Sequence, residues 1–221
     1  MGMKNLFLNA KHWQIFIPIF ILPFGFQFIF MGSIMPSPNF DGQPPEMPDM
    51  QVFQNFLQWL PLLIAASTFI QFGWIWSVAS GLKEMVPGEA KLKYKRFQWL
   101  FAIPAVYIAL LVAALAYFLS TLMPDLLANK FNPSEEEIGS FVAIFFGVFF
   151  LHLLAIGCIF YCIWHVAKSI KCAEVQRDVR GSELAGYFFL TWLLPVGIWF
   201  LQPVINKLYQ YGPEAIDDEA L

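Results

Sequence analysis

Four long stretches of this 221-residue chain contain no aspartate, glutamate, lysine or arginine. They cover residues 13–35, 52–82, 99–123 and 138–167. Each is longer than the roughly 20 residues that a helix needs to cross the hydrocarbon core of a bilayer. Charged residues make up only 13% of the chain and hydrophobic residues 58%, which excludes an ordinary soluble domain. The sequence therefore predicts an all-α, polytopic membrane helix bundle with four transmembrane helices, and the lipid bilayer as its environment.

Lysine and arginine gather in two of the connections between these stretches. Residues 83–96 hold five of them and residues 168–180 hold four, whereas the two intervening connections share only Lys130. Cytoplasmic loops of membrane proteins are enriched in lysine and arginine, so both basic connections are expected in the cytoplasm, together with the N-terminus. Tryptophans at the same helix ends are expected to lie among the lipid headgroups, namely Trp13, Trp74, Trp76, Trp99 and Trp164.

The chain contains an internal similarity. IWSVASGLK begins at Ile75, and IWHVAKSIK begins 88 positions later at Ile163. Both copies enter from the same side, so we predict two parallel helical-hairpin repeats, although chance matching in so apolar a chain is the alternative. The predicted organisation is a first hairpin repeat, a second hairpin repeat, a C-terminal membrane segment and an acidic tail, over residues 1–96, 97–181, 182–211 and 212–221 respectively.

Small residues recur every fourth position on the third and fourth predicted spans. Such stripes let two helix backbones approach closely in a membrane. We predict that the two stripes pack against each other within the second hairpin, and the alternative is a face for a second copy of the chain. The residues are Ala105, Ala109 and Ala113 on one span and Gly139, Ala143 and Gly147 on the other.

The apolar run FFLTWLLPVGIWFLQPVINKL, near the C-terminus, contains helix-breaking residues. It is just long enough to cross a bilayer, so we predict a fifth span with a kink at Pro195 and Gly197. A re-entrant or interfacial segment is the alternative, favoured by the polar pair Gln202 and Asn206.

This run, together with HWQIF near the start of the chain, resembles the ending and opening of an uncharacterised family of small polytopic bacterial membrane proteins. The resemblance implies a multi-pass protein of the bacterial inner membrane. That family brings no assigned activity, cofactor or functional residues.

Few side chains inside the predicted spans can carry chemistry. Cys158, Cys162 and His165 share one face of the fourth span, where two thiolates and an imidazole suit zinc or copper if another helix supplies a fourth ligand. The alternative is ordinary packing of small apolar residues.

Three further polar residues, Gln27, Gln71 and His152, are candidate contacts on a solute pathway, or alternatively packing residues. For His152, a hydrogen bond to a neighbouring helix is the structural interpretation.

These patterns favour a non-enzymatic interaction or accessory subunit of a membrane complex, which binds a membrane-protein partner or a second copy of itself. One alternative is a homo-oligomeric transporter of a neutral or lipid-like solute. A second is a membrane metal protein or enzyme. No cofactor is predicted, and the chain has no basic surface for nucleic acid.

Overall fold

We analysed a computed structural model, which describes residues 3–34, 50–124 and 135–214. Every secondary-structure element in these ranges is helical. Four of the described helical spans are long and apolar enough to cross a membrane, and they are His12–Gly32, Phe56–Gly81, Tyr94–Leu122 and Gly139–Val175. The predicted all-α membrane bundle is therefore confirmed for this part of the chain.

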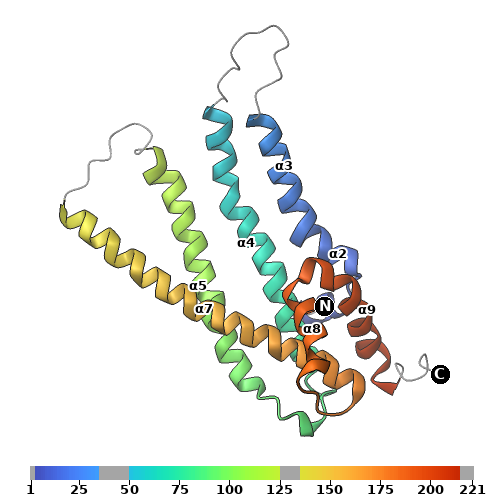
Figure 1. The fold of residues 1–221 in the computed structure, drawn as a ribbon. Coiled ribbons are helices and arrows are strands. Elements are labelled where there is room, and N and C mark those ends of the chain that lie inside the picture. The colour runs from blue at the N-terminus through green and yellow to red at the C-terminus, as the bar shows by residue number, and fades with distance from the viewer. Residues whose placement is uncertain (1–2, 35–49, 125–134, 215–221) are drawn as a thin grey trace.

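The spans form two helical hairpins (Figure 1). The first hairpin consists of α2 (His12–Phe16), the π-helical η1 (Ile17–Ile21), α3 (Leu22–Ile34) and α4 (Met50–Gly81). The second consists of α5 (Tyr94–Tyr117), the π-helical η3 (Phe118–Leu122) and α7 (Glu135–Val175). The short helix η2 (Gly88–Ala90) lies in the connection between them. The two hairpins begin at the same end of the molecule, as the predicted repeats require.

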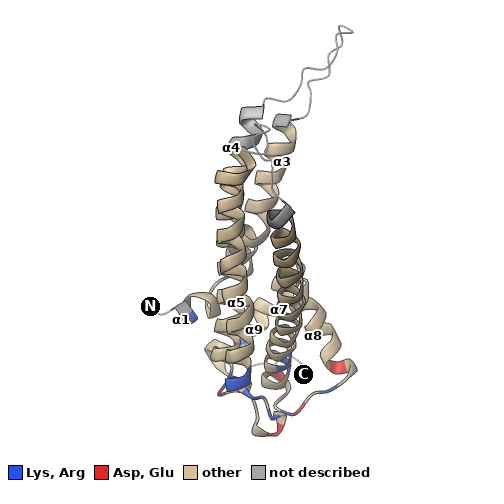
Figure 2. Ribbon diagram, turned by 90° about the vertical axis from the view of Figure 1, so that its left-hand side faces the viewer, with Lys and Arg blue, Asp and Glu red and all other residues tan. Residues whose placement is uncertain are grey.

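Lysine and arginine gather at one end of the bundle, which we call the basic end (Figure 2). It carries the α4–α5 connection and the C-terminal end of α7. The hairpins pack together near this end and diverge toward the opposite one, which we call the far end (Figure 1). The main hydrophobic core accordingly joins α4, α5 and α7 near the basic end, with fully buried side chains that include Trp74, Val78, Leu82, Phe97, Val166 and Ile170.

Matching positions of the two predicted repeats are buried alike. Val78 and its counterpart Val166 are both 0% exposed, as are Leu82 and Ile170. The tryptophans behave differently from the prediction. Trp13 and Trp99 are exposed, as residues at a membrane surface would be, but Trp74 is fully buried in the core rather than placed among headgroups.

The short N-terminal helix α1 (Met3–Leu8) packs against α4 through two glycines. A Cβ atom built on Gly73 would lie 2.8 Å from the Phe7 ring, and one on Gly81 would lie 2.4 Å from Leu8 Cδ1. Glycine is needed at both positions because the aromatic and aliphatic side chains of α1 occupy the space that a larger residue would take. This contact holds the N-terminal segment against the end of α4.

The predicted kinked fifth span is instead a pair of helices, α8 (Ser182–Trp192) and α9 (Leu194–Tyr211), bent by 117°. The break falls at Leu193, and Pro195 lies in the first turn of α9, where its missing N–H leaves no helical hydrogen bond unmade. Gly197 allows the sharp bend, because a Cβ there would lie 1.8 Å from the Leu190 carbonyl oxygen. The run therefore turns much more sharply than a proline kink.

Both ends of the α8–α9 pair lie toward the basic end (Figures 1 and 2). Its apex is beside α7, where the ring centroids of Phe160 and Trp192 are 5.5 Å apart. Near the C-terminal end of α9, Tyr209 donates a hydrogen bond to Asn5 Oδ1. The bent pair fits either the predicted fifth span, broken at Leu193, or the re-entrant alternative. Residues 215–221 of the predicted acidic tail lie outside the described residues.

A buried amide fastens α9 to the rest of the molecule. Gln202 is 0% exposed, and its Oε1 accepts a hydrogen bond of 2.8 Å from Trp74 Nε1. Its Nε2 lies 2.9 Å from the carbonyl oxygen of Phe7 and 3.0 Å from that of Ala10, where α1 has ended and leaves carbonyl groups without helical partners. Asn206 also donates to the Ala10 carbonyl oxygen. These two polar residues in an apolar run therefore serve helix packing.

Candidate functional site

The far half of α7 is left uncovered by the rest of the described chain. Every residue from Gly139 to Leu154 is exposed, whichever side of the helix it lies on, and Ala155 is the first buried residue. α7 contacts α5 at its middle, where Tyr107 Oη and His152 Nδ1 form a 3.0 Å hydrogen bond, and then diverges from it. No described helix therefore covers the side chains from Val142 to Leu154, a length of more than three turns.

The structure does not bring the two small-residue stripes together. A Cβ built on Gly139 or Gly147 meets no atom within 4 Å, and Ala143 is exposed, so the predicted packing of this stripe within the hairpin is wrong. On α5, Ala105 and Ala109 instead line an apolar groove of about 340 Å³ against α4, and Ala113 is exposed. The stripe on α7 does not meet the stripe on α5, because the two helices diverge between Tyr107 and the far end.

The three candidate pathway residues are not gathered into one site. Gln27 on α3 is exposed, Gln71 on α4 is half-buried, and His152 on α7 is bonded to Tyr107. The lining residues of four cavities in the described chain include none of the three. The hydrogen bond of His152 agrees with its structural interpretation, and its contact with a solute stays a prediction.

The candidate metal ligands are buried but do not form a metal site. Cys158, Cys162 and His165 are each at most 5% exposed, and no group of three or more histidine, cysteine, aspartate or glutamate side chains in the described residues could hold a metal ion. The His165 ring instead stacks on Phe97, with ring centroids 4.7 Å apart. The missing fourth ligand that the sequence required is not supplied by another described helix.

A polar cavity of about 170 Å³ lies at the basic end, between the end of α4, the α4–α5 connection and α7. Lys83 and Lys91 line it from the α4–α5 connection, Tyr94 lines it from the first turn of α5, and His165 and Ser169 line it from α7. His165 is 1% exposed, and its Nδ1 has no hydrogen-bond partner in the described chain. Ser169 Oγ donates to the His165 carbonyl oxygen over 2.8 Å. We call this the basic-end cavity.

The two basic connections differ in how their charges are compensated. Lys168, near the C-terminal end of α7, has its Nζ 2.7 Å from Asp178 Oδ1, in an ion pair whose angles depart from hydrogen-bond geometry. Arg180 contacts the other oxygen of Asp178 at 2.8 Å. Both contacts lower the pKa of Asp178 from its ordinary value of 3.8, and the contact with Lys168 has the larger effect.

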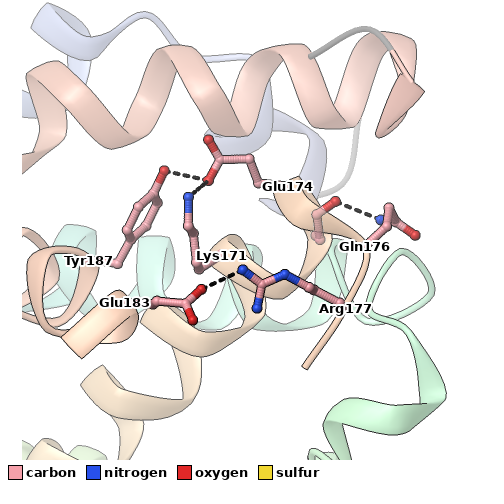
Figure 3. Close-up of polar contacts among 7 residues, drawn as sticks. Lys171, Glu174, Gln176, Arg177, Glu183 and Tyr187 are labelled. Carbon is pink, nitrogen blue, oxygen red and sulfur yellow. Dashed lines mark hydrogen bonds and ion pairs between the residues drawn. The ribbon is translucent and has the colours of Figure 1, made fainter. Parts of the chain in front are cut away.

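The remaining two cations of this connection are paired as well (Figure 3). Lys171 Nζ lies 2.9 Å from Glu174 Oε2, which also accepts a hydrogen bond from Tyr187, and Arg177 pairs with Glu183 at 2.6 Å. Gln176 then donates to the Met85 carbonyl oxygen and so ties the connection to the end of α4. By contrast, none of the five cations in residues 83–96 forms an ion pair with a carboxylate in the described ranges.

Sequence reasoning used Lys83 and Lys91 only to orient the chain and missed that they line a cavity with His165. The internal similarity contained one indication of a polar position in the core. Ser77 and His165 occupy matching positions of the two predicted repeats, and both are buried. Ser77 Oγ and His165 Nδ1 both lack a hydrogen-bond partner in the described chain.

The fold and these two regions define a polytopic α-helical membrane protein with four candidate spans in its described part and a bent helix pair at the basic end. No protein-family model matches the chain, and no curated protein and no solved structure matches it either. The HWQIF segment and the C-terminal apolar run contact each other, since His12 and Trp199 have ring centroids 4.3 Å apart.

Proposed function

We propose that this protein is a non-enzymatic subunit that assembles with a second transmembrane helix along the far half of α7. The supporting observation is the exposure of every residue from Gly139 to Leu154. The assembly joins either two copies of this chain or this chain and another membrane protein. The proposed function is therefore that of an interaction or accessory subunit of a membrane complex.

The small residues on α7 support a protein helix rather than lipid alone as the occupant. Association of helices in a bilayer depends on close backbone packing, which Gly139, Ala143 and Gly147 permit on one side of the helix. Elsewhere in this molecule, Gly73 and Gly81 show the same device already used, because side chains of α1 fill the space beside them. The corresponding space beside Gly139 and Gly147 is empty.

We also propose that the basic end faces the cytoplasm and that the membrane is the bacterial inner membrane. The excess of lysine and arginine in residues 83–96 and 168–180 supports this orientation. It places the N-terminal segment and the α8–α9 pair on the cytoplasmic side, and the far half of α7 in the outer leaflet.

Native mass spectrometry on protein extracted in mild detergent from its own membranes tests the assembly. Gly147→Leu fills the stripe, whereas Val148→Phe adds bulk on the other side of the same helix and serves as the control. We expect a stoichiometric complex for the native chain and for Val148→Phe, and a monomer for Gly147→Leu. A monomeric native chain, or equal loss in the two variants, would rule out assembly through this stripe.

Transport of a solute has weaker support, because Gln27, Gln71 and His152 do not share a cavity. Metal chemistry at Cys158, Cys162 and His165 is not proposed, since the described residues form no metal-binding group there.

A further inference from the structure

The basic-end cavity has the chemistry of an anion site, and this inference is independent of how α7 assembles. Two lysines of the α4–α5 connection, Lys83 and Lys91, line the cavity, and no aspartate or glutamate side chain is among its lining residues. Neither lysine is paired with a carboxylate in the described chain, although Lys83 Nζ lies 5.2 Å from the centroid of the Tyr94 ring. No carboxylate therefore neutralises the two cations at the cavity.

Hydrogen-bonding groups accompany the charge. The hydroxyl-bearing residues Tyr94 and Ser169 and the imidazole of His165 line the same space. His165 is nearly completely buried, yet Nδ1 has no partner among the described residues, although an unsatisfied buried polar group destabilises a folded protein. Nδ1 itself is closed to solvent in this structure, so a ligand in the cavity contacts it only after a small movement of the His165 ring. A bound ion or ordered water is one of the explanations for a buried polar group without a partner.

The size and position of the cavity restrict which ligands it can bind. Its volume of about 170 Å³ corresponds to about five or six waters at about 30 Å³ each, which is enough for a phosphate group but not for a whole lipid. It lies where the apolar ends of α4, α5 and α7 meet the basic α4–α5 connection, the level at which a lipid headgroup would sit.

We propose that the basic-end cavity binds a phosphate group, with the ammonium groups of Lys83 and Lys91 supplying both the positive charge and the hydrogen-bond donors. The phosphate belongs either to an anionic lipid headgroup or to free phosphate from the adjoining solution. Both sources present the same oxygens to the same side chains, and they are separated by experiment.

The test uses the full chain in maltoside micelles, which contain no phosphate. Thermal unfolding is followed by circular dichroism with increasing phosphatidylglycerol, inorganic phosphate or, as a lipid control without phosphate, diacylglycerol. A ligand that binds only the folded protein raises the unfolding midpoint as its concentration increases. Binding of phosphatidylglycerol alone assigns a lipid headgroup, and binding of inorganic phosphate assigns free phosphate.

The cavity variant combines Lys83→Gln with Lys91→Asn, because asparagine tolerates the left-handed backbone at position 91, where φ is 49°. The matched control combines Lys93→Gln with Lys95→Gln, which removes the same charge from the same connection without touching the cavity lining. We expect the apparent dissociation constant to rise at least about tenfold in the cavity variant and less than about threefold in the control.

Two results would overturn the proposal. One is that neither phosphatidylglycerol nor inorganic phosphate shifts the midpoint of the native chain. The other is that the two double variants lose binding equally, which would show a diffuse charge effect. If the cavity variant does not fold, Lys91→Asn alone decides between these outcomes, with Lys93→Gln as its control.

Discussion

Replacing Gln202 by leucine should release α9 from the N-terminal segment. In the native protein this fully buried amide joins Trp74 on α4, the carbonyl groups of Phe7 and Ala10, and Asn206. Leucine fills a similar volume but makes none of these bonds. The Trp74 N–H would then be buried with no acceptor, and the Phe7 carbonyl would keep only a 3.4 Å contact from the Ala10 N–H.

The amide oxygen accepts one hydrogen bond and the two amide hydrogens are shared among three acceptors, so the magnitude follows from about three full hydrogen bonds. Interhelical hydrogen bonds in membranes average about 0.6 kcal/mol, so their loss amounts to roughly 2 kcal/mol. An orphaned indole N–H adds about 1–3 kcal/mol. We therefore expect Gln202→Leu to lower the free energy of unfolding by roughly 3–5 kcal/mol.

Reversible unfolding in mixed micelles of SDS and a mild detergent, followed by circular dichroism, measures this change. Gln210→Leu is the control, because Gln210 is exposed and makes only a 3.5 Å contact with Asn9, and its effect should stay within about 0.5 kcal/mol. In a Trp74→Phe background the cost of Gln202→Leu should fall, since the indole no longer needs an acceptor. A loss below about 1 kcal/mol for Gln202→Leu would refute the reasoning.

Three further substitutions test separate parts of the fold. Gly197→Ala should lower the free energy of unfolding by about 3 kcal/mol or more in the same assay, because the added methyl group meets the backbone of α8. Gly25→Ala is the control, because no atom lies within 4 Å of the added methyl group. It should be neutral or stabilising by up to about 1 kcal/mol. The lowered pKa of Asp178 means that its ion pairs stabilise the fold above about pH 4 and lose this effect as pH falls through the folded-state pKa. Asp178→Asn should therefore unfold more easily than the native chain at pH 7, by a difference that shrinks as the pH falls below 3.8, and a difference that stays constant over this range would contradict the assignment. Tyr107→Phe should cost about 0.6 kcal/mol, and no more than about 1.7, through loss of the bond to His152, with a larger effect indicating a further role.

The sequence was sufficient for the spans because bilayer thickness imposes a local requirement on length and composition. Long charge-free runs predicted the four candidate spans. Such signals depend only on neighbouring residues, so they could be read without any knowledge of packing.

Contacts between distant segments were not predictable in the same way. Gln202 and Phe7 are 195 positions apart, and nothing local to either indicates that one binds the other. The 117° bend depends on Gly197 meeting the backbone at Leu190, whereas the proline beside it predicted only a kink. The small residues of α7 were predicted to pack on α5, and in the described chain they do not. A small-residue pattern shows that close packing is allowed, but it does not show which helix packs there.

For the candidate sites too, local sequence patterns were predictive and contacts between distant residues were not. Lysine and arginine counts located the basic end, but the basic-end cavity requires Lys83 and His165 to meet, which only the packing of α4 against α7 determines. His165 was predicted as a metal ligand from its spacing to Cys162, and the stacking of its ring on Phe97 could not be read from that spacing.

Photo-crosslinking in native membranes tests the central claim, assembly along α7, most directly. A photoreactive residue at Ala143 is compared with one at Leu110, which is 66% exposed on α5 and lies outside the α7 stripe. We predict a protein adduct of defined mass from position 143 and lipid adducts alone from position 110. Lipid adducts alone from both positions would contradict the account.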